Sequence, residues 1–195
     1  YVTSSQPGAA GACQGAGIGP TRISSVIGVV KAYTTRVGEG PFPTEIEGPE
    51  AEVLRQIGKP WAEVGTTTGR ARRVGWFDAV IARYAAQVNG IDTLAVTKLD
   101  VLDTLPTIRI CTGYRLHETQ LEYPPATVAV LSQVEPIYEE MPGWQTPTSG
   151  IRRFADLPEA AQAYLARICQ LVGARLGIVS VGPDRDQTIM VADVF

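Results

Sequence analysis

Histidine and cysteine, which build many redox, metal and acid–base sites, are scarce in the sequence. It contains one histidine, His117, and three cysteines, Cys13, Cys111 and Cys169, which are odd in number and far apart. This pattern fits neither a disulfide framework nor a paired-thiol zinc site, and it favours a reducing compartment such as the cytosol. His117 lies in a polar stretch between expected strands, so we expect a surface residue rather than a general acid. No catalytic dyad is visible.

Long apolar runs and a strong charge bias are also missing. No run approaches the roughly 20 apolar residues that cross a bilayer, and no basic-then-apolar leader opens the chain, so we expect a cytoplasmic protein without a membrane partner. Charged residues make up 19% of the 195 residues, with a formal net charge of −3. We therefore expect no nucleic-acid-coating surface, and any anion site must be local. Because the chain lacks an initiator Met, we expect a segment of a longer protein.

One segment is dominated by glycine and alanine, from Gly8 to Pro20. Its glycine spacing is not that of a dinucleotide fingerprint, and no Gly-Lys-Ser or Gly-Lys-Thr follows at the offset of a P-loop. We interpret the segment as a flexible loop, with a phosphate cradle as the alternative.

Apolar periodicity elsewhere predicts one mixed α/β unit over residues 1–195. The strands are expected at Val26–Tyr33, Thr93–Thr97, Thr107–Tyr114 and Leu176–Val181, and the helices at Glu50–Ile57, Trp76–Val88 and Leu157–Val172. Gly58, Gly90 and Gly173 follow the three helices as expected stops.

Two of these helices carry an apolar face at helical spacing. We expect the Trp76–Val88 helix to bury this face in the core. We expect the Leu157–Val172 helix to bury its own apolar face and to end before Gly173. These faces consist of Phe77, Val80, Ile81, Tyr84 and Val88 in one helix, and of Tyr164, Leu165, Ile168 and Val172 in the other.

The densest polar cluster is the arginine loop, residues 66–73, which precedes the Trp76 helix. Arginine offers a planar fork that matches a carboxylate or phosphate, and threonine hydroxyls can satisfy the remaining lone pairs. The loop therefore indicates an anion site, with a solvated basic turn as the alternative. An RNA-binding role is disfavoured, because no interleaved aromatic residues accompany the arginines. The loop reads Thr66, Thr67, Thr68, Gly69, Arg70, Ala71, Arg72, Arg73.

Two further loops follow expected strands, where α/β folds commonly bind ligands. In the segment Thr97–Asp100, the Asp100 carboxylate could accept from both N1–H and the 2-amino group of guanine, and the stem of Lys98 could cover the base. In the segment Ser180–Arg185, a glycine permits close approach and a proline could pack on a purine. An ordinary turn is the alternative for each loop. Together the three loops point to a nucleotide and a small carboxylate.

Several long motifs resemble adenylosuccinate synthetases. The run from Gly28 to Glu45 reads GVVKAYTTRVGEGPFPTE, and the similarity covers nearly the whole chain. It continues through GRARRVGW from Gly69, TKLDVLD from Thr97, EPIY from Glu135, MPGW from Met141 and GPDR from Gly182. The resemblance implies the carboxy-terminal part of a P-loop-type, mixed-sheet nucleotide-binding fold, incomplete without its amino-terminal half.

The resemblance also implies an activity and binding residues. The family joins IMP to L-aspartate with hydrolysis of GTP, uses Mg2+ and forms homodimers. By resemblance, GTP contacts Arg72, Lys98, Leu99, Asp100, Ser180, Val181, Gly182 and Pro183. IMP contacts Thr3, Val37 and Arg70, and aspartate contacts Thr66, Thr67, Thr68, Gly69, Arg70, Ala71 and Arg72.

The sequence departs from the family pattern in two ways. Ala71 replaces one of four successive arginines, which we expect to tune the charge of the loop rather than to abolish binding. The phosphate loop, the catalytic aspartate and histidine, and with them the Mg2+ ligands, belong to the absent amino-terminal part. We therefore expect this segment alone to be inactive. A noncatalytic nucleotide-binding or interaction module of the same fold is the alternative function.

Overall fold

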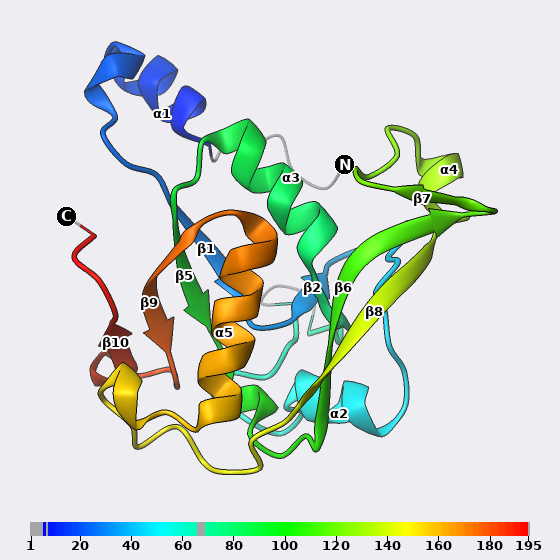
Figure 1. Ribbon diagram of the computed structural model, residues 1–195, viewed down its shortest axis with the longest axis vertical. Helices are drawn as coiled ribbons and strands as arrows, with labels where there is room; N and C mark the ends of the chain where they lie inside the picture. Colours follow the sequence, from blue (N-terminus) through cyan, green and yellow to red (C-terminus); the bar gives the residue numbers. More distant parts are fainter. Residues whose placement is uncertain (1–5, 7, 66–68, 195) are drawn as a thin grey trace.

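One of the two four-stranded sheets in the described residues, called the parallel sheet below, consists mainly of parallel strands. The computed structural model describes residue 6, residues 8–65 and residues 69–194. The strands have the order β1 (Ile27–Lys31), β5 (Thr93–Thr97), β9 (Arg175–Ser180) and β10 (Thr188–Met190), of which only β10 is antiparallel to its neighbour. The carboxyl ends of β1, β5 and β9 therefore meet at one edge (Figure 1).

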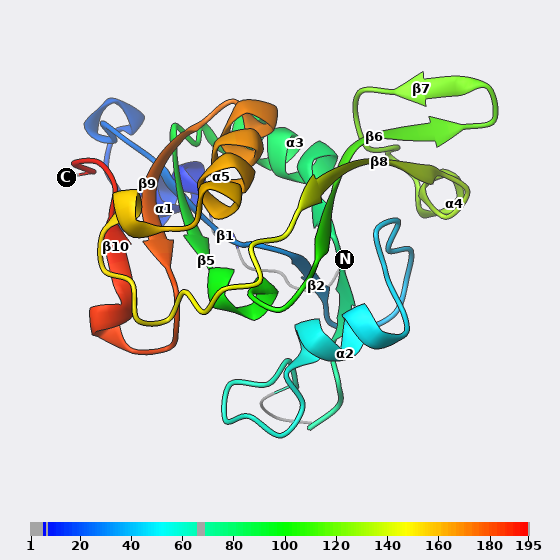
Figure 2. The same cartoon turned by 60° about the horizontal axis from the view of Figure 1, so that its bottom comes forward.

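A second sheet is built around a long strand, β6 (Thr107–Leu116). β6 pairs in parallel with β4 (Phe77–Asp78) and antiparallel with β7 (Thr119–Leu121) and β8 (Glu135–Pro142). Figure 2 shows the far ends of β6, β7 and β8 extending to one side of the molecule beside α4 (Val128–Leu131). A separate two-stranded ribbon joins β2 (Thr34–Arg36) to β3 (Arg73–Gly75).

Two helices pack against each other over the parallel sheet, α3 (Ala79–Asn89) and α5 (Glu159–Val172) (Figure 1). α5 buries Tyr164, Leu165 and Ile168, and the Tyr164 hydroxyl donates to the Ala32 carbonyl at 2.6 Å, just after β1. This bond satisfies a polar group inside the core. The remaining helices are short: α1 (Ala9–Ala16), α2 (Pro49–Arg55), and the 3-10 turns η1 (Pro20–Arg22), η2 (Leu99–Leu102), η3 (Phe154–Asp156) and η4 (Arg185–Gln187).

Several expected elements are confirmed. The strand Thr93–Thr97 has the expected bounds, and the helices before Gly90 and Gly173 end with those glycines in the left-handed region. The expected strand from Thr107 continues to Leu116 and turns back at His117, which is exposed. The apolar face of α5 is buried as expected.

The expected flexible loop at Gly8–Pro20 is wrong, because Ala9–Ala16 forms the helix α1. Alanine favours helix strongly enough to offset the two glycines that the helix contains, and Gly17 ends it in the left-handed region. Of its residues only Cys13 is buried.

The expected core face of the Trp76–Val88 helix is also partly wrong. Phe77 is buried in β4, and Asp78 caps the helix by accepting from two backbone N–H groups. In α3 itself, Ile81, Tyr84 and Val88 are 40%, 45% and 61% exposed. Val80 of the expected face is fully buried, and Ala79 and Ala86 fill the rest of the buried side of α3.

A glycine at the end of β8 permits a close approach that positions the following tryptophan. A Cβ built on Gly143 would lie 1.8 Å from the Leu105 carbonyl oxygen. The next residue, Trp144, donates through Nε1 to Asp103 Oδ1 at 2.7 Å, and Asp103 also accepts from the backbone and hydroxyl of Thr148. These bonds hold the chain just after η2.

We expect Gly143→Ala to destabilise the protein by about 1–3 kcal/mol, because the backbone around Leu105 must move to admit the methyl group. The measurement is the urea midpoint of unfolding. Gly150→Ala is the matched control, since a Cβ there meets no atom within 4 Å. Equal midpoints for the two variants would contradict the expectation.

Candidate functional site

Two of the loops singled out in the sequence lie side by side. Thr97–Asp100 follows β5, and Ser180–Arg185 follows β9, which is its parallel neighbour. Both therefore lie at the carboxyl edge of the parallel sheet, where ligands bind in open α/β folds. The structure places these two candidate segments together.

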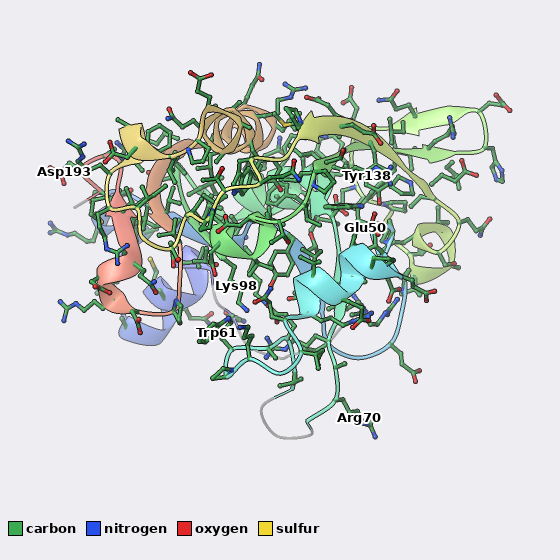
Figure 3. The ribbon with its side chains drawn as sticks, turned by 90° about the horizontal axis from the view of Figure 1, so that it is seen from below. Glu50, Trp61, Arg70, Lys98, Tyr138 and Asp193 are labelled. Carbon is green, nitrogen blue, oxygen red and sulfur yellow. The ribbon has the colours of Figure 1, made fainter. Side chains whose placement is uncertain are left out.

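Lys98 connects the first of these loops to the chain before the arginine loop. Its backbone is left-handed, with φ of 60°, and its Nζ lies 3.1 Å from the Trp61 carbonyl oxygen and 2.9 Å from Glu63 Oε1. Figure 3 shows Lys98 directed toward Trp61. The proposed base-binding loop is thus fixed to a segment more than thirty residues earlier.

At the centre of the site is a buried carboxylate, Glu63, with 0% exposure. Its Oε1 accepts from Lys31 Nζ at 2.7 Å and from the Tyr33 hydroxyl at 2.8 Å. Its Oε2 accepts from Arg72 at 2.9 Å. With Lys98, these residues form the Glu63 cluster, in which three cations surround one anion.

The cluster changes the acid–base behaviour of its members. Burial alone would raise the pKa of Glu63, but hydrogen bonds from Lys31, Lys98 and Tyr33 outweigh it and lower the pKa to about 2. Burial lowers the pKa of Lys31, and the bond to Glu63 opposes that change. Burial and the nearby Glu63 charge raise the pKa of Tyr33 far above its usual range. Glu63 is therefore ionised at neutral pH and its cationic partners remain bound.

We expect this carboxylate to stabilise the fold above pH 4.5, its ordinary pKa, and to lose that contribution as the pH falls toward 2, where Glu63 is protonated in the folded state. The contribution is on the order of 3 kcal/mol. Urea unfolding between pH 5 and 2 measures it. Glu63→Gln should flatten this part of the stability curve, and an unchanged slope would contradict the assignment.

The described residues on either side of residues 66–68 pair as the two arms of a hairpin. Val64 bridges Ala71, the Gly65 N–H donates to the Arg70 carbonyl oxygen at 2.8 Å, and the Arg72 N–H donates to the Glu63 carbonyl oxygen at 2.8 Å. Figure 3 shows Arg70 on the part of the hairpin that projects away from the sheet. The expected ligands Thr66, Thr67 and Thr68 lie outside the described residues, as does Thr3.

The two arginines assigned to ligands differ in their surroundings. Arg70 is exposed, with Gly69 and Ala71 exposed beside it. Arg72 is half-buried and bound to Glu63, and within the described part of the chain its Nε is buried without a hydrogen-bond partner. An unpaired buried donor is costly, and an anion that reached Nε would satisfy it.

The residues expected to contact a base have distinct environments. Asp100 is partly buried, and burial raises the pKa of its carboxyl group, with Asp103 adding to the effect. Leu99 is fully buried in the core, so its contribution to a ligand would come from its backbone. Val181 is also buried, while Pro183 is exposed.

A compact turn shapes the second loop. The Ser180 hydroxyl donates to the Gly182 carbonyl oxygen at 2.8 Å, and the Val181 N–H donates to the Gln187 carbonyl oxygen at 2.9 Å. A Cβ on Gly182 would lie 2.1 Å from Gln187 Oε1, so a larger residue there requires the Gln187 side chain to move from its bond with the Asp184 N–H. Pro183, within this turn, is exposed.

The IMP candidate Val37 is exposed just after β2. Arg73 of β3 holds the turn that follows Val37, because it donates to the Gly40 carbonyl oxygen at 2.7 Å and to Glu45 Oε1 at 2.7 Å. The ribbon of β2 and β3 therefore connects Val37 to the arginine loop. Beside this ribbon and α3 is a cavity of about 460 Å³, whose lining includes Val30, Tyr33, Phe42, Phe77 and Ile81.

Three residues of the Glu63 cluster were not predicted from the sequence: Lys31, Tyr33 and Glu63. One signal was present, since Lys31 interrupts an otherwise apolar run in an expected buried strand. A lysine in such a position requires a partner. No sequence pattern indicated that the partner would be Glu63, 32 residues later.

None of the helices in the described part of the chain has the length and apolarity of a membrane span. Within the described ranges, no three His, Cys, Asp or Glu side chains gather as metal ligands would.

Comparison with known sequences identifies close relatives. The family model for adenylosuccinate synthetase matches residues 1–189. The chain is 58% identical to the adenylosuccinate synthetase of Carboxydothermus hydrogenoformans and 57% identical to that of Desulforudis audaxviator, each over 195 residues. Each alignment covers 100% of this chain and 45% of the relative. The chain thus spans a little under half the length of these relatives.

Solved structures give the same result. The fully ligated adenylosuccinate synthetase of Plasmodium falciparum is 37% identical, with a TM-score of 0.91 over 98% of this chain and 46% of that chain. The succinoaminodeoxyadenylate synthetase of cyanophage S-2L is 17% identical with a TM-score of 0.52, which shows a shared fold alone. The α/β mixed-sheet fold expected from the sequence is therefore that of part of an adenylosuccinate synthetase. On the match to the family model, the chain belongs to the adenylosuccinate synthetase family.

Proposed function

We propose that the complete protein, meaning this segment together with the remainder that its full-length relatives possess, forms adenylosuccinate from IMP, L-aspartate and GTP. In this proposal residues 1–195 are the carboxy-terminal part of a single domain with a P-loop-type fold. The family match and the long shared motifs support the proposal.

The proposed reaction has two steps. The γ-phosphoryl group of GTP passes to the oxygen on C6 of IMP, and GDP leaves. The amino nitrogen of aspartate then attacks C6 and loses a proton, and phosphate leaves. We assign neither chemical step to a side chain of this segment, whose role is to bind and orient the substrates. The segment alone is expected to be inactive.

We propose that guanine binds between the two loops at the carboxyl edge of the parallel sheet. Asp100 accepts from N1–H and the 2-amino group, which adenine does not present as donors at these positions. Lys98 and the backbone of Leu99 border the base on one side, and Ser180, Val181, Gly182 and Pro183 border it on the other. The adjacency of β5 and β9 supports this arrangement.

We propose that the arginine loop binds the substrate anions. Arg70 contacts IMP and aspartate, and Arg72 contacts aspartate and GTP, because a guanidinium can bond a carboxylate or phosphate through two N–H groups. Thr66, Thr67, Thr68, Gly69 and Ala71 complete the aspartate loop, and Thr3 and Val37 contact IMP. The observation that carries the proposal is the Glu63 cluster, which brings Arg72 and Lys98 onto one carboxylate.

Three further properties are proposed from the family. Mg2+ is the expected cofactor, held by residues of the remainder, and when bound it would neutralise phosphate charge. No step above is assigned to it. The complete protein is expected to be a cytoplasmic homodimer.

The test is to assay the purified complete protein with IMP, aspartate, GTP and Mg2+. We expect adenylosuccinate and phosphate in equal amounts, and no product when any one substrate is omitted. The alternative is a noncatalytic nucleotide-binding module, for which GTP would bind without turnover. That result would refute the proposed ligase activity.

A further inference from the structure

Glu63 lies between two loops that we propose to bind different substrates. Oε1 is 2.9 Å from Nζ of Lys98, which belongs to the guanine loop. Oε2 accepts at 2.9 Å from Arg72, which belongs to the aspartate loop. One carboxylate therefore contacts both loops through different oxygen atoms.

Glu63 is positioned to act through its partners rather than on a substrate. Its side chain has no exposed surface, and both oxygens are occupied by protein donors. Lys31 and Tyr33 hold Oε1 from β1 and the residues that follow it, at 2.7 and 2.8 Å. These two bonds connect the carboxylate to the parallel sheet on the side of the guanine loop.

Engaging the buried Nε of Arg72, in a side chain that is 29% exposed overall, requires this arrangement to shift. One terminal nitrogen is bound to Glu63, and among the described residues the buried Nε has no partner. A carboxylate or phosphate that engages Nε must first gain access to it. The hairpin and the bond to Glu63 must then move, and the change is transmitted to Oε1 and Lys98, since the carboxylate is rigid.

We infer that Glu63 is a positioning residue that couples the guanine site to the aspartate site. Occupation of the guanine loop fixes Lys98, which fixes Glu63 and the orientation of Arg72. Occupation of the aspartate loop acts in the reverse direction, because binding linkage is reciprocal. This inference rests on the proposed function, which assigns the two loops to GTP and aspartate.

The experiment measures the KM for aspartate in the complete protein at low and at saturating GTP, with IMP saturating. In the unmodified protein we expect the KM to differ about fivefold or more between the two conditions. Glu63→Gln keeps the size of the side chain but removes its charge, and it should bring the ratio close to one. Glu139→Gln is the control, because it weakens an ion pair with Arg167 outside the cluster.

A second variant keeps the test decisive if Glu63→Gln does not fold. Tyr33→Phe removes only one hydrogen bond to Oε1 and leaves every charge in place. It should reduce the ratio to half or less while Glu139→Gln retains it. A merely structural role for Glu63 would lower the amount of active protein without changing the ratio.

Two results would overturn the inference while leaving the proposed function intact. The first is an active unmodified protein whose KM for aspartate does not depend on GTP. The second is a ratio that survives in Tyr33→Phe and in folded Glu63→Gln. A complete protein that forms no adenylosuccinate would instead refute the proposed function, and the inference with it.

Discussion

Asp100→Asn in the complete protein is expected to lower the specificity constant for GTP by roughly two or more powers of ten. The proposed guanine contact needs two acceptors, and the amide supplies one acceptor and one donor. The mismatch leaves buried polar groups unpaired, at about 1–3 kcal/mol for each group. Asp100 is already partly buried, so water cannot fully compensate.

The same substitution should favour xanthosine triphosphate. Xanthine carries a carbonyl where guanine carries the 2-amino group, so the Asn amide can donate to it and its carbonyl can accept from the adjacent ring N–H. The measurement compares specificity constants for the two nucleotides. Asp156→Asn is the control, because Asp156 belongs to an exposed pair with Arg153. Retention of the original GTP preference would remove Asp100 from the base site.

Arg70→Leu should weaken the use of both IMP and aspartate, with a loss of about 2–4 kcal/mol in transition-state stabilisation. The physical reason is the loss of a bidentate partner for a carboxylate or phosphate. Steady-state kinetics with each substrate varied in turn measures the effect, and GTP should be affected less.

The control for Arg70 is Arg115→Leu, which removes an exposed arginine of β6 that is paired with Glu135 of β8. Exposed pairs contribute little to stability, so this variant should retain its kinetics. Unchanged kinetics for both substrates in Arg70→Leu would exclude Arg70 from the site.

Sequence patterns predicted the parts of the fold that are determined by interactions between residues close in sequence. The glycines after α3 and α5 mark helix ends because only a left-handed residue closes them easily. The positions of Thr97–Asp100 and Ser180–Arg185 followed from the strands before them, although their adjacency required the pairing of β5 with β9.

Features that depend on distant contacts were missed. The Glu63 cluster joins residues from four separate stretches of the chain, and no spacing rule connects Lys31 to Glu63 or Lys98. The exposed side of α3 was assigned to the core because its apolar residues repeat like those of a buried face. Periodicity reports which residues share a face, and tertiary packing decides which face is covered.

The order of strands in the parallel sheet has a consequence for the time course of folding. β5 must pair with β9, and the bond from Arg175 to Thr93 spans 82 residues. At about 5–20 residues per second, the ribosome needs several seconds to deliver β9 after β5 has emerged. During that interval β5 presents an unpaired edge of buried-type residues, which invites association with other chains. Newly made chains should therefore depend on chaperones until α5 and β9 have been synthesised.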